Sequence, residues 1–347
     1  MDATTQQMLA LLRASLNNAV PDQLPATTEE WEKLFWLSRK HGVVTMINDA
    51  IEQLPPQQQP QGDIALSWTL SAERTRYHYN HQAEVLETIR RKADAEGIRL
   101  GLIKGMSLSR YYPTPCSRPC GDIDIFFMPL TKKNYERGNI LLGCPDAALD
   151  GKHAEVAIDG VAVENHLHFL DLNYISQRRA ERYIRASLSD VSSEGYLSPM
   201  GNMVYLLMHT VCHLTAKFKL PLRNILDWGM FLKANSDVLN PADCRRVMRR
   251  IGMVPAFNML TLLAGEFVGD DLSRFVSSPV PQEDIDRMRE LILDKKYLDH
   301  VPAGLNPVER FRVRLQRNRQ RRWLYRYLPS TAAERVLNNL IRLVYKK

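Results

Sequence analysis

Apolar residues recur at helical spacing over the first 95 residues of the chain. Residues 8–16 and 31–37 each place large apolar side chains three or four positions apart, which predicts two amphipathic helices. A stretch rich in proline and glutamine, residues 54–63, interrupts this pattern and predicts a loop. The helical period then resumes and predicts a long helix from about Ile64 to Ala95, which Gly97 ends.

Shorter apolar runs replace the helical period after residue 98. Residues 99–103 predict a strand, Gly105 a turn and residues 106–112 a short helix. A loop containing three prolines follows, and residues 122–127 predict a second strand. This part of the chain is therefore of mixed secondary structure.

A β-hairpin is predicted within residues 154–171. Asp159 and Gly160 lie between two alternating runs, and this dipeptide is typical of a type I′ turn. Residues of the second arm alternate between the two faces of the predicted strand. One carries Val161, Val163, Asn165 and Leu167, and the other carries Ala162, Glu164, His166 and His168.

Helical periods return from about Pro199 and continue to the end, with helices expected at residues 203–217 and near residues 225–234. The predicted fold class is α+β, a small mixed β-sheet core flanked by N- and C-terminal helical regions. We expect an N-terminal helical region at 1–95, an α/β core at 96–198 and a C-terminal helical region at 199–347.

The composition is that of an ordinary globular protein, with 45% hydrophobic and 24% charged residues in a chain of 347. The first 16 residues predict an amphipathic helix and lack the pattern of a signal peptide. No apolar run approaches the roughly 18 residues needed to span a bilayer. We therefore expect a cytoplasmic protein without membrane association. The five scattered cysteines argue against a disulfide framework.

Positive charge is concentrated near the C-terminus. The net charge is +7, and residues 310–326 carry eight arginines and no acid. Such a block indicates a phosphate-bearing partner such as RNA, or an acidic surface. We favour the alternative of a solvated helix whose arginine stems cover apolar neighbours. The positions expected on its buried face are Phe311, Leu315, Trp323, Leu324 and Tyr327.

Two aspartates, Asp122 and Asp124, occupy alternate positions of a predicted strand. Their side chains therefore share one face, while Ile123, Ile125 and Phe127 share the other. Burying two unpaired carboxylates costs several kcal/mol. Because oxygen ligands suit Mg²⁺, we favour a divalent metal site here over a structural ion pair.

The Lys104-Gly105 turn ends one predicted strand and opens a short helix. Backbone N–H groups at such a position bind phosphate, Ser107 adds a hydroxyl donor, and Lys104 adds a positive charge. Arg118 lies in the loop that leads to the aspartates. The alternative is a tight strand-to-helix turn that binds nothing.

Glu164 lies on the polar face of the predicted hairpin arm. As a third carboxylate it would let the site hold two cations, or it would take the proton from an attacking hydroxyl. The alternative is an exposed strand glutamate. His166 is either a general base or substrate ligand, or a half-buried strand histidine.

His209 and His213 are four residues apart in a predicted helix, a spacing able to hold a transition metal. We favour hydrogen-bonding roles at a cleft wall, or helix packing. Arg223 and Asp227 are also four residues apart, and either pair with each other or leave Arg223 to contact phosphate.

The run KG…R…GDIDIFF, followed by ENH on a later strand, resembles the nucleotidyltransferase superfamily. More narrowly it resembles the bacterial uncharacterised nucleotidyltransferase family with a Lys-Gly turn and an R-x-x-G-D-x-D segment. The segment HTVCH, then LRNILDWGMFL, is similar to that family's H-x-x-x-H…L-R-x-x-x-D segment. The matches span roughly residues 100–232, and residues 1–95 and about 235–347 lie outside the resemblance.

The resemblance implies that Asp122 and Asp124 ligate Mg²⁺ (or Mn²⁺) that carries a nucleoside triphosphate, and that Glu164 is the third carboxylate of the site. We expect Glu164 to activate the acceptor, and we count it also as a candidate metal ligand. Gly105 and Ser107 would line the phosphate site. We expect transfer of a nucleoside monophosphate, AMP from ATP, to a hydroxyl-type acceptor whose identity the sequence does not specify. Lys104 and Arg118 would offset the charge of the triphosphate. The alternative is a catalytically silent module that binds a nucleotide or RNA through residues 310–326.

Overall fold

The computed structural model describes residues 1–147, 149, 151–217, 220–293, 306, 309, 312, 322–329 and 334. Its N-terminal part is helical, as predicted, with the helices α1 (Ala3–Asn17), α2 (Thr28–His41), α3 (Val44–Ile51) and α4 (Asp63–Ala95). Helix α2 begins at a capping box in which Thr27 and Glu30 each accept the other's backbone N–H. The predicted loop separates α3 from α4 and contains the short 3₁₀ turn Pro56–Gln58.

Four strands form a mixed sheet in the order β1-β2-β4-β3, which confirms the α+β fold class. The strands are β1 (Arg99–Ile103), β2 (Ile123–Met128), β3 (His153–Ile158) and β4 (Val161–His166). Strand β2 pairs antiparallel with β1 and parallel with β4, and β3 and β4 form the predicted hairpin. The turn residues Asp159 and Gly160 have φ of 50° and 78°, the left-handed values that a type I′ turn requires.

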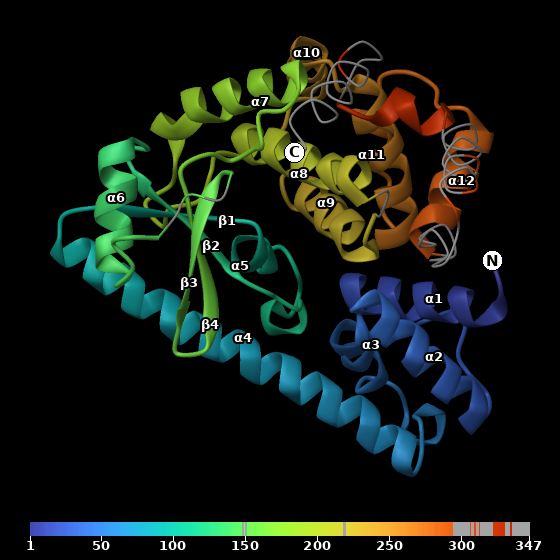
Figure 1. The fold of residues 1–347 in the computed structure, drawn as a ribbon. Coiled ribbons are helices and arrows are strands. Elements are labelled where there is room, and N and C mark those ends of the chain that lie inside the picture. The colour runs from blue at the N-terminus through green and yellow to red at the C-terminus, as the bar shows by residue number, and fades with distance from the viewer. Residues whose placement is uncertain are drawn as a thin grey trace.

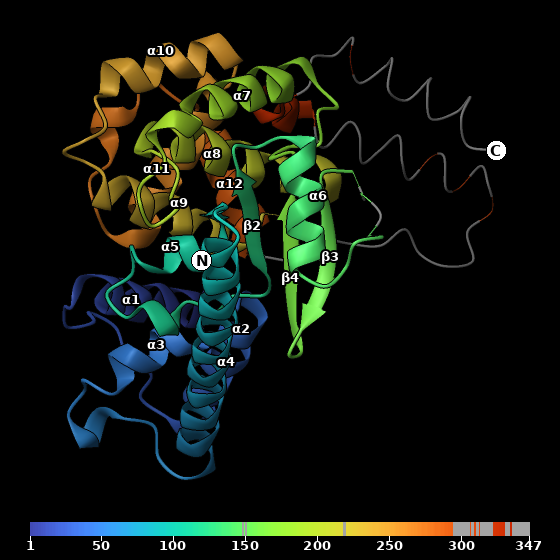
Figure 2. The ribbon, with the colours of Figure 1, turned by 90° about the vertical axis from the view of Figure 1, so that its left-hand side faces the viewer.

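The two faces of the sheet have different neighbours (Figures 1 and 2). Ile123, Ile125 and Phe127 lie on the face covered by α4 and by α6 (Lys132–Leu141), where they join one apolar cluster. On the opposite face Phe126 packs against Phe169 and belongs to the larger core. Asp124 lies on this second face, so the sheet turns its acidic side chains toward the C-terminal helices.

The C-terminal helices pack beside the sheet and also contact the N-terminus. They are α7 (Ile175–Ala186), α8 (Pro199–Lys217), α9 (Leu222–Ala234), α10 (Pro241–Ile251), α11 (Val254–Val268) and α12 (Gln282–Leu293). Helices α8 and α9 were predicted, whereas α6 and α7 were not. Asn17 of α1 donates to the carbonyl of Val268, which joins the first helix of the chain to α11.

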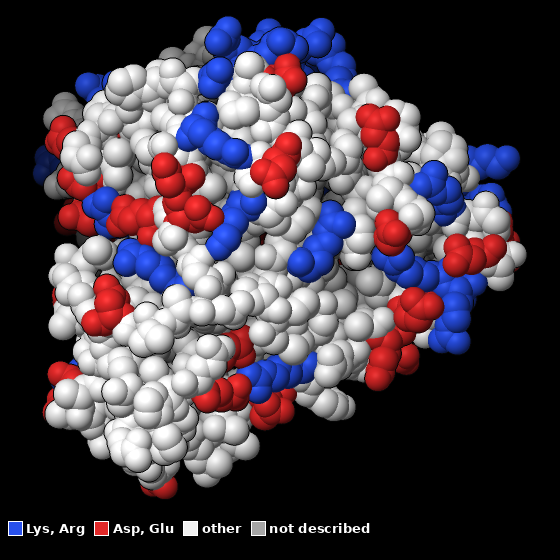
Figure 3. All heavy atoms as spheres, turned by 180° about the vertical axis from the view of Figure 1, so that it is seen from behind, with Lys and Arg blue, Asp and Glu red and all other residues white. Residues whose placement is uncertain are grey.

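Helix α10 carries a run of exposed positive charge. Lys and Arg side chains gather at the top edge of the molecule in Figure 3, where α10 lies. The arginines of this helix are Arg245, Arg246, Arg249 and Arg250. Among the described residues, no helix is both long enough and apolar enough to cross a membrane.

Most of the arginine-rich block at residues 310–326 lies outside the described residues, and so do Phe311 and Leu315. Leu324 and Tyr327 of the 3₁₀ helix Arg322–Tyr327 are buried, and Trp323 is half-buried. The Tyr327 hydroxyl donates to Asp284 at 2.7 Å. This end of the block therefore packs against the body of the protein.

Candidate active site

Three carboxylates converge on the face of the sheet that is turned toward α8 and α9. The parallel pairing of β2 and β4 places Asp124 directly opposite Glu164, and Asp122 precedes β2 by one residue. One oxygen from each of the three lies within 4.8 Å of the others. Asp124 is only 1% exposed, and its Oδ2 atom has no hydrogen-bond partner. The three acids therefore form one group, with the aspartates at the start of β2 and Glu164 on the neighbouring strand β4.

Two basic side chains lie against these acids. The Lys104 ammonium forms an ion pair with Asp124 Oδ1, and it lies 3.5 Å from Glu164 Oε2. His166 is fully buried, and its Nε2 lies 2.9 Å from Asp124 Oδ1 and 3.1 Å from Glu164 Oε2. Lys104 was expected to meet phosphate, but here its ammonium meets the acids. His166 is buried completely, beyond the half-burial expected of a strand histidine.

The charges of this group shift one another's pKa values. Burial raises the pKa of Asp122 to about 6, and the charge of Asp124 adds to that shift. Burial would raise the pKa of Glu164, yet the hydrogen bond from His166 and the charge of Lys104 hold it below its usual value. Burial opposes the charged forms of Lys104 and His166, but the carboxylates raise both pKa values. The two basic side chains and the carboxylates therefore stabilise one another's charged forms.

The turn that carries Lys104 is conformationally strained. Lys104 has φ 48° and ψ −151°, a region that side chains other than glycine rarely occupy. Gly105 follows with φ 21°, and a Cβ atom there would lie 3.2 Å from the carbonyl oxygen of Asp122. Buried Ser107 donates its hydroxyl to the Lys104 carbonyl at 2.7 Å. Ser107 therefore stabilises the turn, and α5 (Gly105–Ser109) is too short to add a substantial helix dipole.

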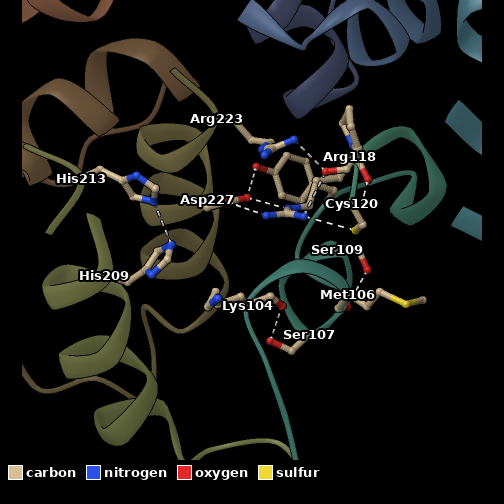
Figure 4. Close-up of polar contacts among 12 residues, drawn as sticks. Lys104, Met106, Ser107, Ser109, Arg118, Cys120, His209, His213, Arg223 and Asp227 are labelled. Carbon is tan, nitrogen blue, oxygen red and sulfur yellow. Dashed lines mark hydrogen bonds and ion pairs between the residues drawn. The ribbon is translucent and has the colours of Figure 1, made fainter. Parts of the chain in front are cut away.

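Arg118 is paired elsewhere than expected. Its guanidinium makes two hydrogen bonds to Asp227 of α9, Nε to Oδ1 at 2.8 Å and Nη2 to Oδ2 at 2.6 Å. The Tyr112 hydroxyl donates to the same carboxylate at 2.7 Å. Arg223, for which pairing with Asp227 was an alternative, instead donates to the carbonyl of Pro119 at 3.1 Å. Arg118 thus joins its loop to α9, as Figure 4 shows.

A cleft of about 430 Å³ lies between the acidic face of the sheet and helices α8 and α9. Of the residues expected at the site, it is lined by Lys104, Gly105, Arg118, Asp122, Glu164, His209, His213, Arg223 and Asp227. In Figure 4 the side chains of His209 and His213 lie next to each other on α8, with their rings nearly perpendicular and their Nε2 atoms 3.2 Å apart. Burial and the nearby Lys104 charge lower the pKa of His209 well below its usual value, so the ring is neutral at pH 7.

A family model described as uncharacterised nucleotidyltransferase matches residues 27–269. The chain belongs to this family. The match extends past the region of resemblance, residues 100–232, on both sides, so it includes helices that were expected to lie outside. No curated protein and no solved structure matches the chain significantly.

All the expected site residues lie within the part of the chain that matches this nucleotidyltransferase family. The cleft is also lined by Lys152 and His153, two titratable residues that were not among the predicted site residues. His153 Nε2 lies 3.4 Å from Glu164 Oε1. The predicted hairpin turn contained the signal that would have found it, because a two-residue turn at Asp159 and Gly160 pairs His153 with His166.

Proposed function

We propose that this protein is a Mg²⁺-dependent enzyme that transfers AMP from ATP to a hydroxyl-type acceptor and releases pyrophosphate. Family membership supports nucleotidyl transfer in general. The metal, the nucleotide and the acceptor class are our inference. The observation that carries it is the group of Asp122, Asp124 and Glu164 at the edge of a cleft large enough for a small-molecule ligand.

The donor set fits a hard divalent cation. The three carboxylates offer oxygen atoms, the ligand type that Mg²⁺ prefers. The buried Oδ2 of Asp124 lacks a hydrogen-bond partner, although a buried carboxylate oxygen normally has one. A bound cation would supply this partner, and it would neutralise charge on the triphosphate during transfer.

We assign the remaining roles from charge and position. In the transfer, the acceptor oxygen bonds to the α-phosphorus, the bond from that phosphorus to the bridging oxygen breaks, and pyrophosphate leaves. The lowered pKa of Glu164 makes it a weak base, so we assign it to the metal and not to proton removal. His209 is neutral and lines the cleft, so its ring can accept a hydrogen bond from the acceptor hydroxyl, whose proton then passes to water. Lys104 would contact the triphosphate once a metal replaces it beside Asp124.

The test is transfer of label from ATP labelled at the α-phosphate, with Mg²⁺, over a panel of acceptors that includes the protein itself. We expect labelling by the wild type and none by the double variant Asp122→Asn with Asp124→Asn. Asp159→Asn is the matched control, because it makes the same chemical change at a turn position whose φ of 50° asparagine tolerates. Labelling that survives the double variant would overturn the assignment of the site.

A further inference from the structure

Glu164 belongs to a second group of ligand atoms beside the carboxylates. His153, Glu164 and His166 each offer one nitrogen or oxygen atom within 4.8 Å of the other two. Strand pairing holds them together, because His153 of β3 lies opposite His166 of β4, and Glu164 precedes His166 by two residues on the same face. We propose that this group, which shares Glu164 with the carboxylates, is a second binding site that takes a divalent transition metal such as Zn²⁺ or Co²⁺.

The ligand types favour a transition metal over Mg²⁺. Two imidazoles and one carboxylate suit Zn²⁺, Fe²⁺ or Co²⁺, whereas Mg²⁺ prefers oxygen alone. Glu164 is able to serve both groups, since Oε1 lies nearest His153 and Oε2 nearest His166 and Lys104. The oxygen-only group and the histidine-containing group are therefore expected to differ in metal preference.

The surroundings of His166 match those of a ligating histidine. Its Nδ1 lies 3.2 Å from the carbonyl oxygen of His168, and its Nε2 points at the carboxylates. Ligating histidines commonly donate one ring N–H to a backbone carbonyl, which orients the other nitrogen toward the metal. This contact and the complete burial of the ring fix the Nε2 atom in place.

An ion can reach this site from the cleft, and the three protein ligands do not fill its coordination sphere. His153 and Glu164 both line the cleft, so an ion can enter from there. Three protein ligands leave at least one coordination position for water or substrate, as in catalytic rather than structural zinc sites. The proposal concerns metal binding alone, and it does not depend on nucleotidyl transfer.

The test is calorimetric titration of the purified, metal-stripped full-length chain with Zn²⁺ or Co²⁺, repeated in excess Mg²⁺. We expect Zn²⁺ or Co²⁺ to bind at one site, and we expect excess Mg²⁺ not to prevent that binding. Half-buried His153 is the residue to change, because replacing the fully buried His166 endangers folding. His153→Ala should weaken this binding by at least about 100-fold, more than the loss of an outer-shell partner costs.

His81→Ala is the matched control. His81 contacts the carbonyl of Asp159 at the tip of the same hairpin but belongs to neither ligand group. The proposal is overturned if His153→Ala binds Zn²⁺ or Co²⁺ as tightly as the wild type, or if the wild type binds neither. Because Asp122→Asn with Asp124→Asn tests label transfer and His153→Ala tests metal binding, either inference can fail while the other stands.

Discussion

Replacing Lys104 with methionine tests whether its ammonium stands where a metal would bind. Methionine keeps an unbranched stem of similar length to that of lysine and lacks the ammonium group, and it must adopt the same strained backbone. Asp124 then loses the Lys104 ammonium and keeps only His166 Nε2 at 2.9 Å, and Glu164 loses a cation 3.5 Å away. Breaking a buried ion pair costs about 3–5 kcal/mol. Since 14% of the Lys104 side chain is exposed, we expect a loss near the lower limit, about 3 kcal/mol.

Mg²⁺ should reverse most of this loss. A ligand at about 100 times its Kd stabilises the folded state by about 2.7 kcal/mol, close to what the substitution removes. In the wild type the ion must first displace Lys104, so Mg²⁺ should stabilise the variant more than the wild type. Urea unfolding with and without Mg²⁺ measures both effects, with Lys152→Met as the control for a cleft lysine outside the acidic group. Equal stabilisation of wild type and variant by Mg²⁺ would refute the reasoning.

Three further predictions concern the same cleft. Arg118→Lys should lower the free energy of unfolding by about 2–3 kcal/mol in urea, because an ammonium cannot make both hydrogen bonds to Asp227. Gly105→Ala should cost about 1 kcal/mol and reduce label transfer, since its φ is positive and its Cβ would crowd the Asp122 carbonyl. Because Asp122 has a pKa of about 6, protons compete with metal below that pH. Calorimetry should therefore find Mg²⁺ binding about tenfold weaker at pH 5 than at pH 7.5, and an unchanged affinity would remove Asp122 from the ligand set.

Two features of the acidic site follow from local sequence and could be predicted from it. Alternation along β2 places Asp122 and Asp124 on one face, and the Asp159-Gly160 turn determines the register of β3 against β4. The distance from the aspartates to Glu164 was not predictable in this way. It depends on the parallel pairing of β2 with β4, and about 30 residues of chain lie between these strands without a local signal for their register.

Ion-pair partners were the least predictable feature of the site. Asp227 has Arg223 four residues away on its own helix, but it pairs with Arg118, which is 109 residues distant in sequence. Two oppositely charged residues four positions apart on one helix can pair at a small cost in chain entropy. However, a buried bidentate pair with a further hydrogen bond from Tyr112 is more favourable than a single-turn helix contact. Such choices are decided by tertiary packing, which a single sequence does not show.

The pairing of Arg118 with Asp227 also determines how the cleft is built. Asp122 and Glu164 come from the sheet, whereas the opposite wall comes from α8 and α9. The side chains of Arg118 and Asp227 are only 5% and 8% exposed, and a two-bond guanidinium–carboxylate contact accepts little change in geometry. This contact therefore fixes α9 relative to the loop that leads into β2. Because a displacement of about 1 Å can cost a transfer reaction about 100-fold, Arg118→Lys should slow label transfer more than it weakens metal binding.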